Sequence, residues 1–285
     1  MNFWQDRALT GTGCVFYGLA FLFALIPLLR RKEYPHLLFL ALLIGGFVFQ
    51  SFGLYVRGLE VHAIPLTNTF EVFQVLAWAS VALNFILRQM FQLRLLNFFS
   101  SAFGFGLSFV SLAVASWDDE GPPLEITGSP WVGFHAVLAI FSYGVFAVLA
   151  LTSLMYLLQD RALARKQTGG WFSMLPAIRQ LEVINAKLIS LGVSLLTIAV
   201  AIGFLNWAQA PGAVGFVKLT IAMGVWLAYL ITMLQRQRKK LVARHFARMC
   251  LALFIVALIS LWPLTHRTAA LPIAHGVDYL DDAHH

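Results

Sequence analysis

The chain has 285 residues, of which 60% are hydrophobic and 12% are charged, and its mean hydropathy is +0.78. These values exclude a soluble domain with a polar surface and predict an integral membrane protein. The net charge of +7 arises mainly in short connections between apolar segments. Membrane topology explains such charges, so we expect no nucleic-acid partner.

Eight apolar segments approach the ~20 residues that a helix needs to cross the hydrocarbon core. In chain order they cover residues 8–29, 36–56, 67–87, 95–116, 131–158, 188–207, 217–234 and 249–264. The sequence therefore predicts an all-α integral membrane protein, a bundle of about eight transmembrane helices that forms a single transmembrane domain over residues 1–285.

The basic residues predict how this bundle is oriented. Sixteen of the 20 lie in alternate connections, which hold residues 30–32, 88 and 94, 161–187 and 236–248. Positive residues in short loops stay in the cytoplasm. Both termini should then lie outside, in the periplasm, for a multi-pass protein of the bacterial inner (cytoplasmic) membrane.

The connection between the second and third segments, RGLEVHAIPLTNTFEVF, holds the first candidate site. Arg57 ends the second helix, Pro65 begins the third, and Asn68 and Glu71 lie on its first turns. In one interpretation Asn68 caps the third helix and Glu71 forms an ion pair with Arg57. In the other, Arg57 is an outward cation available to a carboxylate ligand such as a haem propionate.

The fifth segment, GSPWVGFHAVLAIFSYGVF, places His135 about one turn inside the membrane, ~6 Å along the axis from Trp131. An ionisable ring at that depth costs free energy unless it has a partner. A hydrogen bond to a neighbouring helix would supply one. A neutral imidazole is also a good axial ligand for haem iron. Leu138, Ser142 and Phe146 continue the same helix face and could form a flat wall.

Residues 159–187 form the longest predicted cytoplasmic connection. Apolar residues recur in it at helical spacing, at Trp171, Met174, Leu175, Ile178, Leu181 and Ile184. This pattern predicts an amphipathic helix that either lies in the inner interface or extends the sixth transmembrane helix into the cytoplasm.

The C-terminal segment, WPLTHRTAALPIAHGVDYL, returns His266 and His275 to the same side as His135. Each of them is either an ordinary loop histidine or the second ligand of an iron that His135 binds.

Three of these stretches together resemble the cytochrome c assembly protein family, the haem-handling group that includes CcsA, CcmC and HemX-like proteins. They are RG followed by PLTNTFE, then SPWVGFHAVLAIFSYGVF, then LPIAH, and they span roughly residues 57–275. The resemblance implies non-covalent, stably or transiently bound haem b between His135 and His275, with His266 as a substitute ligand. It also implies that Arg57 contacts a propionate beside Asn68, Glu71 and Trp131.

The chain departs from the family's synthase members in two places. Their tryptophan-rich external motif corresponds here to FLNWAQAPGAVGFVK, which keeps only Trp207, and the following helix lacks their intramembrane histidine. The sequence is therefore most similar to the short HemX-like branch. We expect haem handling or delivery at the periplasmic face in cytochrome c biogenesis, together with other assembly proteins or a membrane complex, and no haem-ligating activity in this chain alone. The alternative is a structural or accessory subunit that binds no haem.

Overall fold

The computed structural model describes residues 3–29, 36–61, 64–66, 68–91, 94–118, 130–166, 175–209 and 216–265. These residues form eight α-helices and one short 3₁₀ helix: α1 (Phe3–Leu29), α2 (His36–Glu60), α3 (Thr69–Phe91), α4 (Arg94–Ala113), η1 (Ala115–Asp118), α5 (Pro130–Ala164), α6 (Ile178–Gln209), α7 (Phe216–Gln237) and α8 (Ala243–Thr265). Each of the eight α-helices is long and apolar enough to cross a membrane. The predicted all-helical membrane bundle is confirmed.

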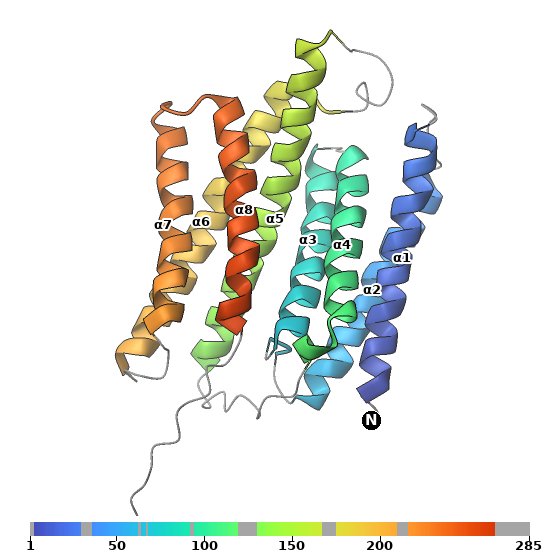
Figure 1. Ribbon diagram of the computed structural model, residues 1–285, viewed down its shortest axis with the longest axis vertical. Helices are drawn as coiled ribbons and strands as arrows, with labels where there is room; N and C mark the ends of the chain where they lie inside the picture. The colour runs from blue at the N-terminus through green and yellow to red at the C-terminus, as the bar shows by residue number, and fades with distance from the viewer. Residues whose placement is uncertain are drawn as a thin grey trace, which may run out of the picture.

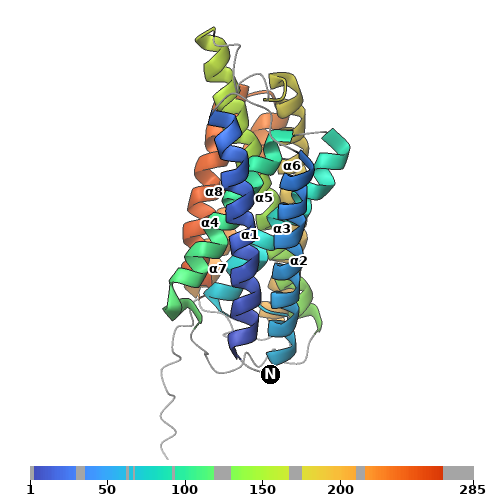
Figure 2. The same cartoon turned by 90° about the vertical axis from the view of Figure 1, so that its right-hand side faces the viewer.

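The helices run alternately up and down, so one end of the bundle collects the start of each odd-numbered helix and the end of each even-numbered one (Figure 1). We call this the His135 end, and the opposite one the Arg161 end. Helices α1–α4 and α5–α8 form two neighbouring groups, which meet chiefly where α3 packs against α5. Figure 2 shows the same bundle from the side on which α1 and α2 lie nearest the viewer.

Glycines allow α1 and α2 to pack closely along much of their length. A Cβ atom on Gly13 would lie 2.9 Å from the backbone oxygen of Gly46, and one on Gly53 would lie 2.6 Å from the Thr10 side chain. In a membrane, where lipid is as apolar as leucine, such close backbone contact is a main source of helix association.

The two longest helices extend beyond the predicted spans. Helix α5 has 35 residues, or about 52 Å at 1.5 Å per residue, against a hydrocarbon core of ~30 Å. It rises past its neighbours at the Arg161 end (Figure 1). In α6 the additional residues include Ile178 to Lys187, the second part of the predicted amphipathic segment. Residues 175–177, which precede α6, are not helical. Residues 167–174 lie outside the described residues, so a helix in that first part stays a prediction.

Candidate functional site

His135 lies on the second turn of α5 and is held by α6. Its Nδ1 atom is 2.6 Å from the backbone oxygen of Ala199. That oxygen belongs to a helix in which residue 203 supplies the usual hydrogen-bond donor four positions later, so the imidazole shares an acceptor that α6 already uses. The interpretation in which a neighbouring helix supplies the partner of His135 is therefore confirmed.

The tautomer of His135 follows from this contact. A carbonyl oxygen only accepts hydrogen bonds, so Nδ1 must carry the proton and Nε2 of the neutral ring must carry the lone pair. Nε2 has no hydrogen-bond partner among the described residues. Anchoring one ring nitrogen on a carbonyl while the other stays free is how proteins orient histidines that bind metals. The two interpretations of His135 are thus compatible.

Gly203 makes room for this ring. A Cβ atom at that position would lie 2.7 Å from Cε1 of His135 and 3.0 Å from Nδ1. Gly203 follows Ala199 by one helical turn, so the same face of α6 supplies both the carbonyl and the space. Any larger side chain here has to displace the imidazole.

The face of α5 that carries His135 has an exposed part before the histidine and a buried part after it. Trp131, one turn earlier, is 62% exposed, whereas Ser142 and Phe146 are fully buried. The Phe146 ring stacks on Tyr229 of α7, with 3.7 Å between ring centroids. Phe146 therefore belongs to the core and does not extend an open wall, and the exposed apolar surface beside His135 comes from the first turns of α5.

Arg57 is enclosed by three carboxylates from three other elements. Its side chain is only 6% exposed, and its nitrogens lie 3.0 Å from Asp6 Oδ2, 2.7 Å from Glu71 Oε1 and 2.6 Å from Asp118 Oδ1. The predicted ion pair between Arg57 and Glu71 is thus confirmed, within a larger cluster that joins α1, α2, α3 and η1. Because Arg57 already has these anions, a propionate would have to replace one of them.

Arg7 is the second cation of this cluster. It binds Asp118 at 2.6 Å and donates to the backbone oxygen of Leu112 at the end of α4, and its side chain is 21% exposed. The guanidinium carbons of Arg7 and Arg57 lie 5.3 and 5.9 Å from the centroid of the Phe70 ring. Burial raises the pKa of the Asp118 carboxyl, and the two guanidinium groups act against that rise.

Asn68 has the predicted capping role. Its Oδ1 accepts a hydrogen bond from the backbone nitrogen of Glu71 at 2.9 Å, the contact expected of an N-cap residue. The sequence suggested that the third helix begins at Pro65, but with this cap α3 begins at Thr69. The fixed start of α3 aims Glu71 at Arg57.

A layer of neutral polar side chains lies beyond the ion cluster, toward the middle of the bundle. Gln50 accepts from the Tyr17 hydroxyl and donates to Gln74 at 2.8 Å, and Gln74 in turn donates to Ser111. All four side chains are buried. Hydrogen bonds of this kind join helices inside a membrane, so the layer explains how α1–α4 are held in register.

The two candidate sites lie at the same end of the bundle and approach each other. Ile64, in the connection between α2 and α3, is close enough to α5 that a Cβ atom on Gly133 would meet its side chain at 3.5 Å. Gly133 is two residues before His135. The loop that positions Asn68 and Glu71 therefore contacts the helix that carries the histidine.

Part of the predicted site lies outside the described residues. His266 and His275 follow the last described residue, Thr265, so their pairing with His135 stays a prediction. In the described ranges no group of three or more His, Cys, Asp or Glu side chains could hold a metal ion. A single histidine completed by a ligand from elsewhere is thus the arrangement to test.

Sequence reasoning missed Asp6, Asp118 and Gly203. A signal existed for the two acids, since each stands at an end of an otherwise apolar segment on the side predicted to hold Arg57. Gly203 carried no signal, because a glycine within an apolar span has many packing roles.

Comparison with known proteins identifies the family. The family model described as Cytochrome C assembly protein matches residues 66–265, from just before α3 to the end of α8. The chain belongs to the cytochrome c assembly protein family. The match includes Glu71, Asp118 and His135, whereas Asp6, Arg57 and His275 lie outside the matched residues.

Three relatives agree with membership of the cytochrome c assembly protein family. Protein HemX of Brevibacillus brevis is 24% identical over 255 residues, which cover 88% of this chain and 93% of the relative. Protein HemX of Bacillus subtilis (strain 168) is 25% identical over 202 residues, 68% of this chain and 70% of the relative. The cytochrome c biogenesis protein CcsA of Synechocystis sp. (strain ATCC 27184 / PCC 6803 / Kazusa) is 27% identical over 115 residues, which cover 40% of this chain and 34% of the relative.

Proposed function

We propose that this protein binds haem non-covalently at the His135 end of the bundle and supplies or relays it in cytochrome c biogenesis. Membership of the cytochrome c assembly protein family supports the pathway. The observation that carries the proposal is the hydrogen bond from His135 Nδ1 to the backbone oxygen of Ala199, which leaves the lone pair of Nε2 available to ligate a metal. Bound haem would supply the iron that this nitrogen ligates.

The C-terminal segment supplies the second ligand in this proposal. Helix α8 ends at Thr265, at the same end of the bundle as the start of α5 (Figure 1). Ten further residues lead to His275, and an extended chain spans up to ~3.5 Å per residue. That reach is ample for His275 to face His135, with His266 as the substitute.

The surroundings of His135 suit one face of a porphyrin. Trp131 and Phe134 are 62% and 50% exposed on the first turns of α5, and an apolar aromatic surface excludes water from a haem plane. Arg57, Asn68 and Glu71 act in this proposal mainly by fixing the start of α3 and the loop beside α5. Direct contact between Arg57 and a propionate stays a prediction.

The distribution of basic residues indicates on which side of the membrane the proposed haem site lies. Among the described residues the Arg161 end carries most of the basic side chains, including Arg161, Arg165, Arg179, Lys240 and Arg248. The positive-inside rule assigns that end to the cytoplasm. Haem would then be held at the periplasmic face of the bacterial inner membrane, where other cytochrome c assembly proteins could receive it.

The test measures haem in detergent-purified protein after addition of haemin, from the Soret absorbance and from extracted haem. We expect His135→Ala to lose most of the bound haem, and His275→Ala to lose haem or change its spectrum because one axial ligand is replaced. His245→Ala is the matched control, since His245 is exposed and lies on α8 near the Arg161 end.

A second pair of variants tests the carbonyl-anchored ring. Gly203→Ala places a methyl group 2.7 Å from the imidazole, whereas a Cβ atom on Gly224 meets nothing within 4 Å. Haem content should fall in Gly203→Ala and stay unchanged in Gly224→Ala. Wild-type protein that retains no haem after unbound haemin is removed by gel filtration would favour the accessory subunit, and haem retained in His135→Ala would remove the ligand assignment.

A further inference from the structure

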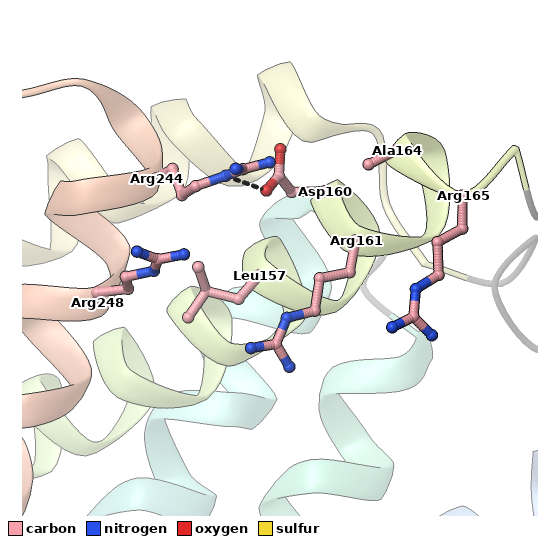
Figure 3. A pocket seen from close by; sticks show the side chains of 7 residues that line it. All are labelled: Leu157, Asp160, Arg161, Ala164, Arg165, Arg244 and Arg248. Atoms are coloured by element: carbon pink, nitrogen blue, oxygen red, sulfur yellow. Dashed lines mark hydrogen bonds and ion pairs between the residues drawn. The ribbon is translucent and has the colours of Figure 1, made fainter.

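A basic pocket lies at the Arg161 end, between the last turns of α5 and the first turns of α8. Its volume is about 220 Å³, and its lining includes Leu157 and Arg161 from α5, Arg165 directly after the end of α5, and Arg244 and Arg248 from α8. Figure 3 shows the guanidinium groups of Arg161, Arg244 and Arg248 arranged around the Leu157 side chain. The pocket is at the opposite end of α5 from His135.

The pocket carries more positive charge than its own acid neutralises. Asp160 also lines it and binds Arg244 Nε at 2.6 Å. Arg161, Arg165 and Arg248 form no ion pair with a carboxylate in the part of the chain that the structure describes. Three guanidinium groups therefore remain around one cavity, in addition to one neutral Arg244–Asp160 pair.

The spacing of the arginines adds a modest repulsion that a bound anion would relieve. Arg161 lies on the last turn of α5, and Arg165 follows four residues later, with its backbone nitrogen bonded to the Arg161 oxygen at 3.1 Å. Arg244 and Arg248 are four residues apart on α8. Like charges at that spacing face each other on a helix and destabilise it. The two helices also pack against each other, so Arg161, Arg165 and Arg248, which have no carboxylate partner among the described residues, are brought to the same place. An anion held among them would remove the repulsion.

We propose that this pocket binds a phosphate group. Guanidinium groups match phosphate oxygens with paired, charge-assisted hydrogen bonds, which favours phosphate over a monovalent spherical anion. The cavity is several times the ~30 Å³ that one water molecule occupies, so a phosphate group fits among the arginines. Its exposed rim leaves room for whatever the phosphate is attached to.

Two sources could supply that phosphate group. One is the headgroup of an anionic lipid, because basic pockets between transmembrane helices on the cytoplasmic side suit such headgroups, and Leu157 offers apolar contact to the attached glycerol and acyl chains. The other is a soluble phosphate from the cytoplasm. The shared chemistry is the same, and the experiment separates the sources.

The test titrates delipidated, detergent-purified full-length protein with dioleoylphosphatidylglycerol or with inorganic phosphate, and uses sodium chloride of equal ionic strength as the blank. Thermal unfolding reports binding, and native mass spectrometry counts retained lipid. The pocket variant is Arg161→Gln/Arg248→Gln, one arginine from each helix. The control is Arg179→Gln/Arg238→Gln, which removes the same charge from exposed positions at the same end, outside the pocket lining.

For wild type and control we expect saturable stabilisation by at least one probe. In the pocket variant the concentration for half-maximal effect should rise at least ~10-fold, because two charge-assisted contacts are lost. A response to phosphatidylglycerol alone assigns a lipid, and a response to inorganic phosphate assigns a soluble ligand. The proposal is wrong if wild type responds to neither probe, or if the pocket variant and the control weaken binding equally.

Discussion

His135 and Arg57 meet the cost of burial in different ways. The imidazole of His135 uses one ring nitrogen on the carbonyl of Ala199. Arg57 is a permanent cation and lies within 3.0 Å of three carboxylate oxygens. The first arrangement leaves a lone pair available to a metal, whereas the second uses its donors within the protein. The histidine is therefore the better candidate for a ligand and the arginine for a structural centre.

Replacing Arg57 tests this structural role. Arg57→Gln removes the cation that lies against the buried carboxylates of Asp6, Glu71 and Asp118, and leaves the Arg7–Asp118 ion pair in place. Breaking a buried ion pair from one side costs about 3–5 kcal/mol in soluble proteins, so the apparent melting temperature in detergent should fall well below that of wild type. Arg238→Gln, an exposed change without an ion pair among the described residues, should leave it unaltered.

Haem content of the same Arg57→Gln variant separates the two roles proposed for the residue. A structural centre predicts lower stability, with haem lost only as the protein unfolds. If the variant unfolds at the wild-type temperature yet binds less haem, Arg57 contacts the ligand and the interpretation of the ion cluster as structural is wrong.

Individual helices of this bundle are apolar around much of their circumference, and small residues select which faces meet. On α1 the face with Gly13 touches the backbone of α2, whereas a Cβ atom on Gly11 would meet nothing within 4 Å. Helix α6 uses Gly203 in the same way toward α5. The glycine faces thus position both the Arg57 cluster, which spans α1 and α2, and the His135 ring between α5 and α6.

Two alanine substitutions on α1 compare these faces directly. Gly13→Ala puts a methyl group 2.9 Å from the Gly46 oxygen and 3.1 Å from the Gln50 nitrogen, both backbone atoms that cannot move away alone. Gly11→Ala adds the same methyl to open space, and alanine favours a helix by up to about 1 kcal/mol over glycine. Thermal unfolding should therefore show a loss for Gly13→Ala and no loss for Gly11→Ala. Equal effects would mean that α1 and α2 are not in close contact.

The whole molecule is electrically asymmetric, and α5 links its two ends. His135 lies near the first turns of this helix, while Arg161 and Arg165 lie at its other end. The proposed haem site and the proposed phosphate pocket are thus separated by most of the bilayer. Their assignment to periplasm and cytoplasm depends on one fact, the sidedness of the bundle.

Cysteine labelling measures that sidedness. The native thiols, Cys14 and Cys250, are 5% and 1% exposed, so an impermeant maleimide should not reach them. Gln5→Cys and Lys240→Cys place exposed thiols at the His135 end and the Arg161 end. We expect labelling of Gln5→Cys in spheroplasts and of Lys240→Cys only in inverted vesicles. The reverse pattern would put both proposed sites on the wrong sides, and unchanged wild type serves as the control.

The length and composition of the apolar segments determined the architecture of the bundle by themselves. An apolar segment of ~20 residues in lipid must form a helix, because every backbone group has to be hydrogen-bonded within the segment. That requirement is local, so the number and positions of the eight helices could be predicted, whereas the ends of α5 and α6 that extend beyond the hydrocarbon core could not. The cap at Asn68 and the Arg57–Glu71 pair were also foreseeable, since their members lie close together in the sequence.

Only the tertiary structure decided which distant residues share a site. Asp6, Arg57 and Asp118 are brought together from α1, α2 and η1, and the carbonyl of Ala199 meets His135 from another helix. Apolar faces of transmembrane helices resemble one another, so hydropathy does not specify which of them pack together. That choice depends on glycine contacts and buried hydrogen bonds between helices, which become visible only when the helices are assembled.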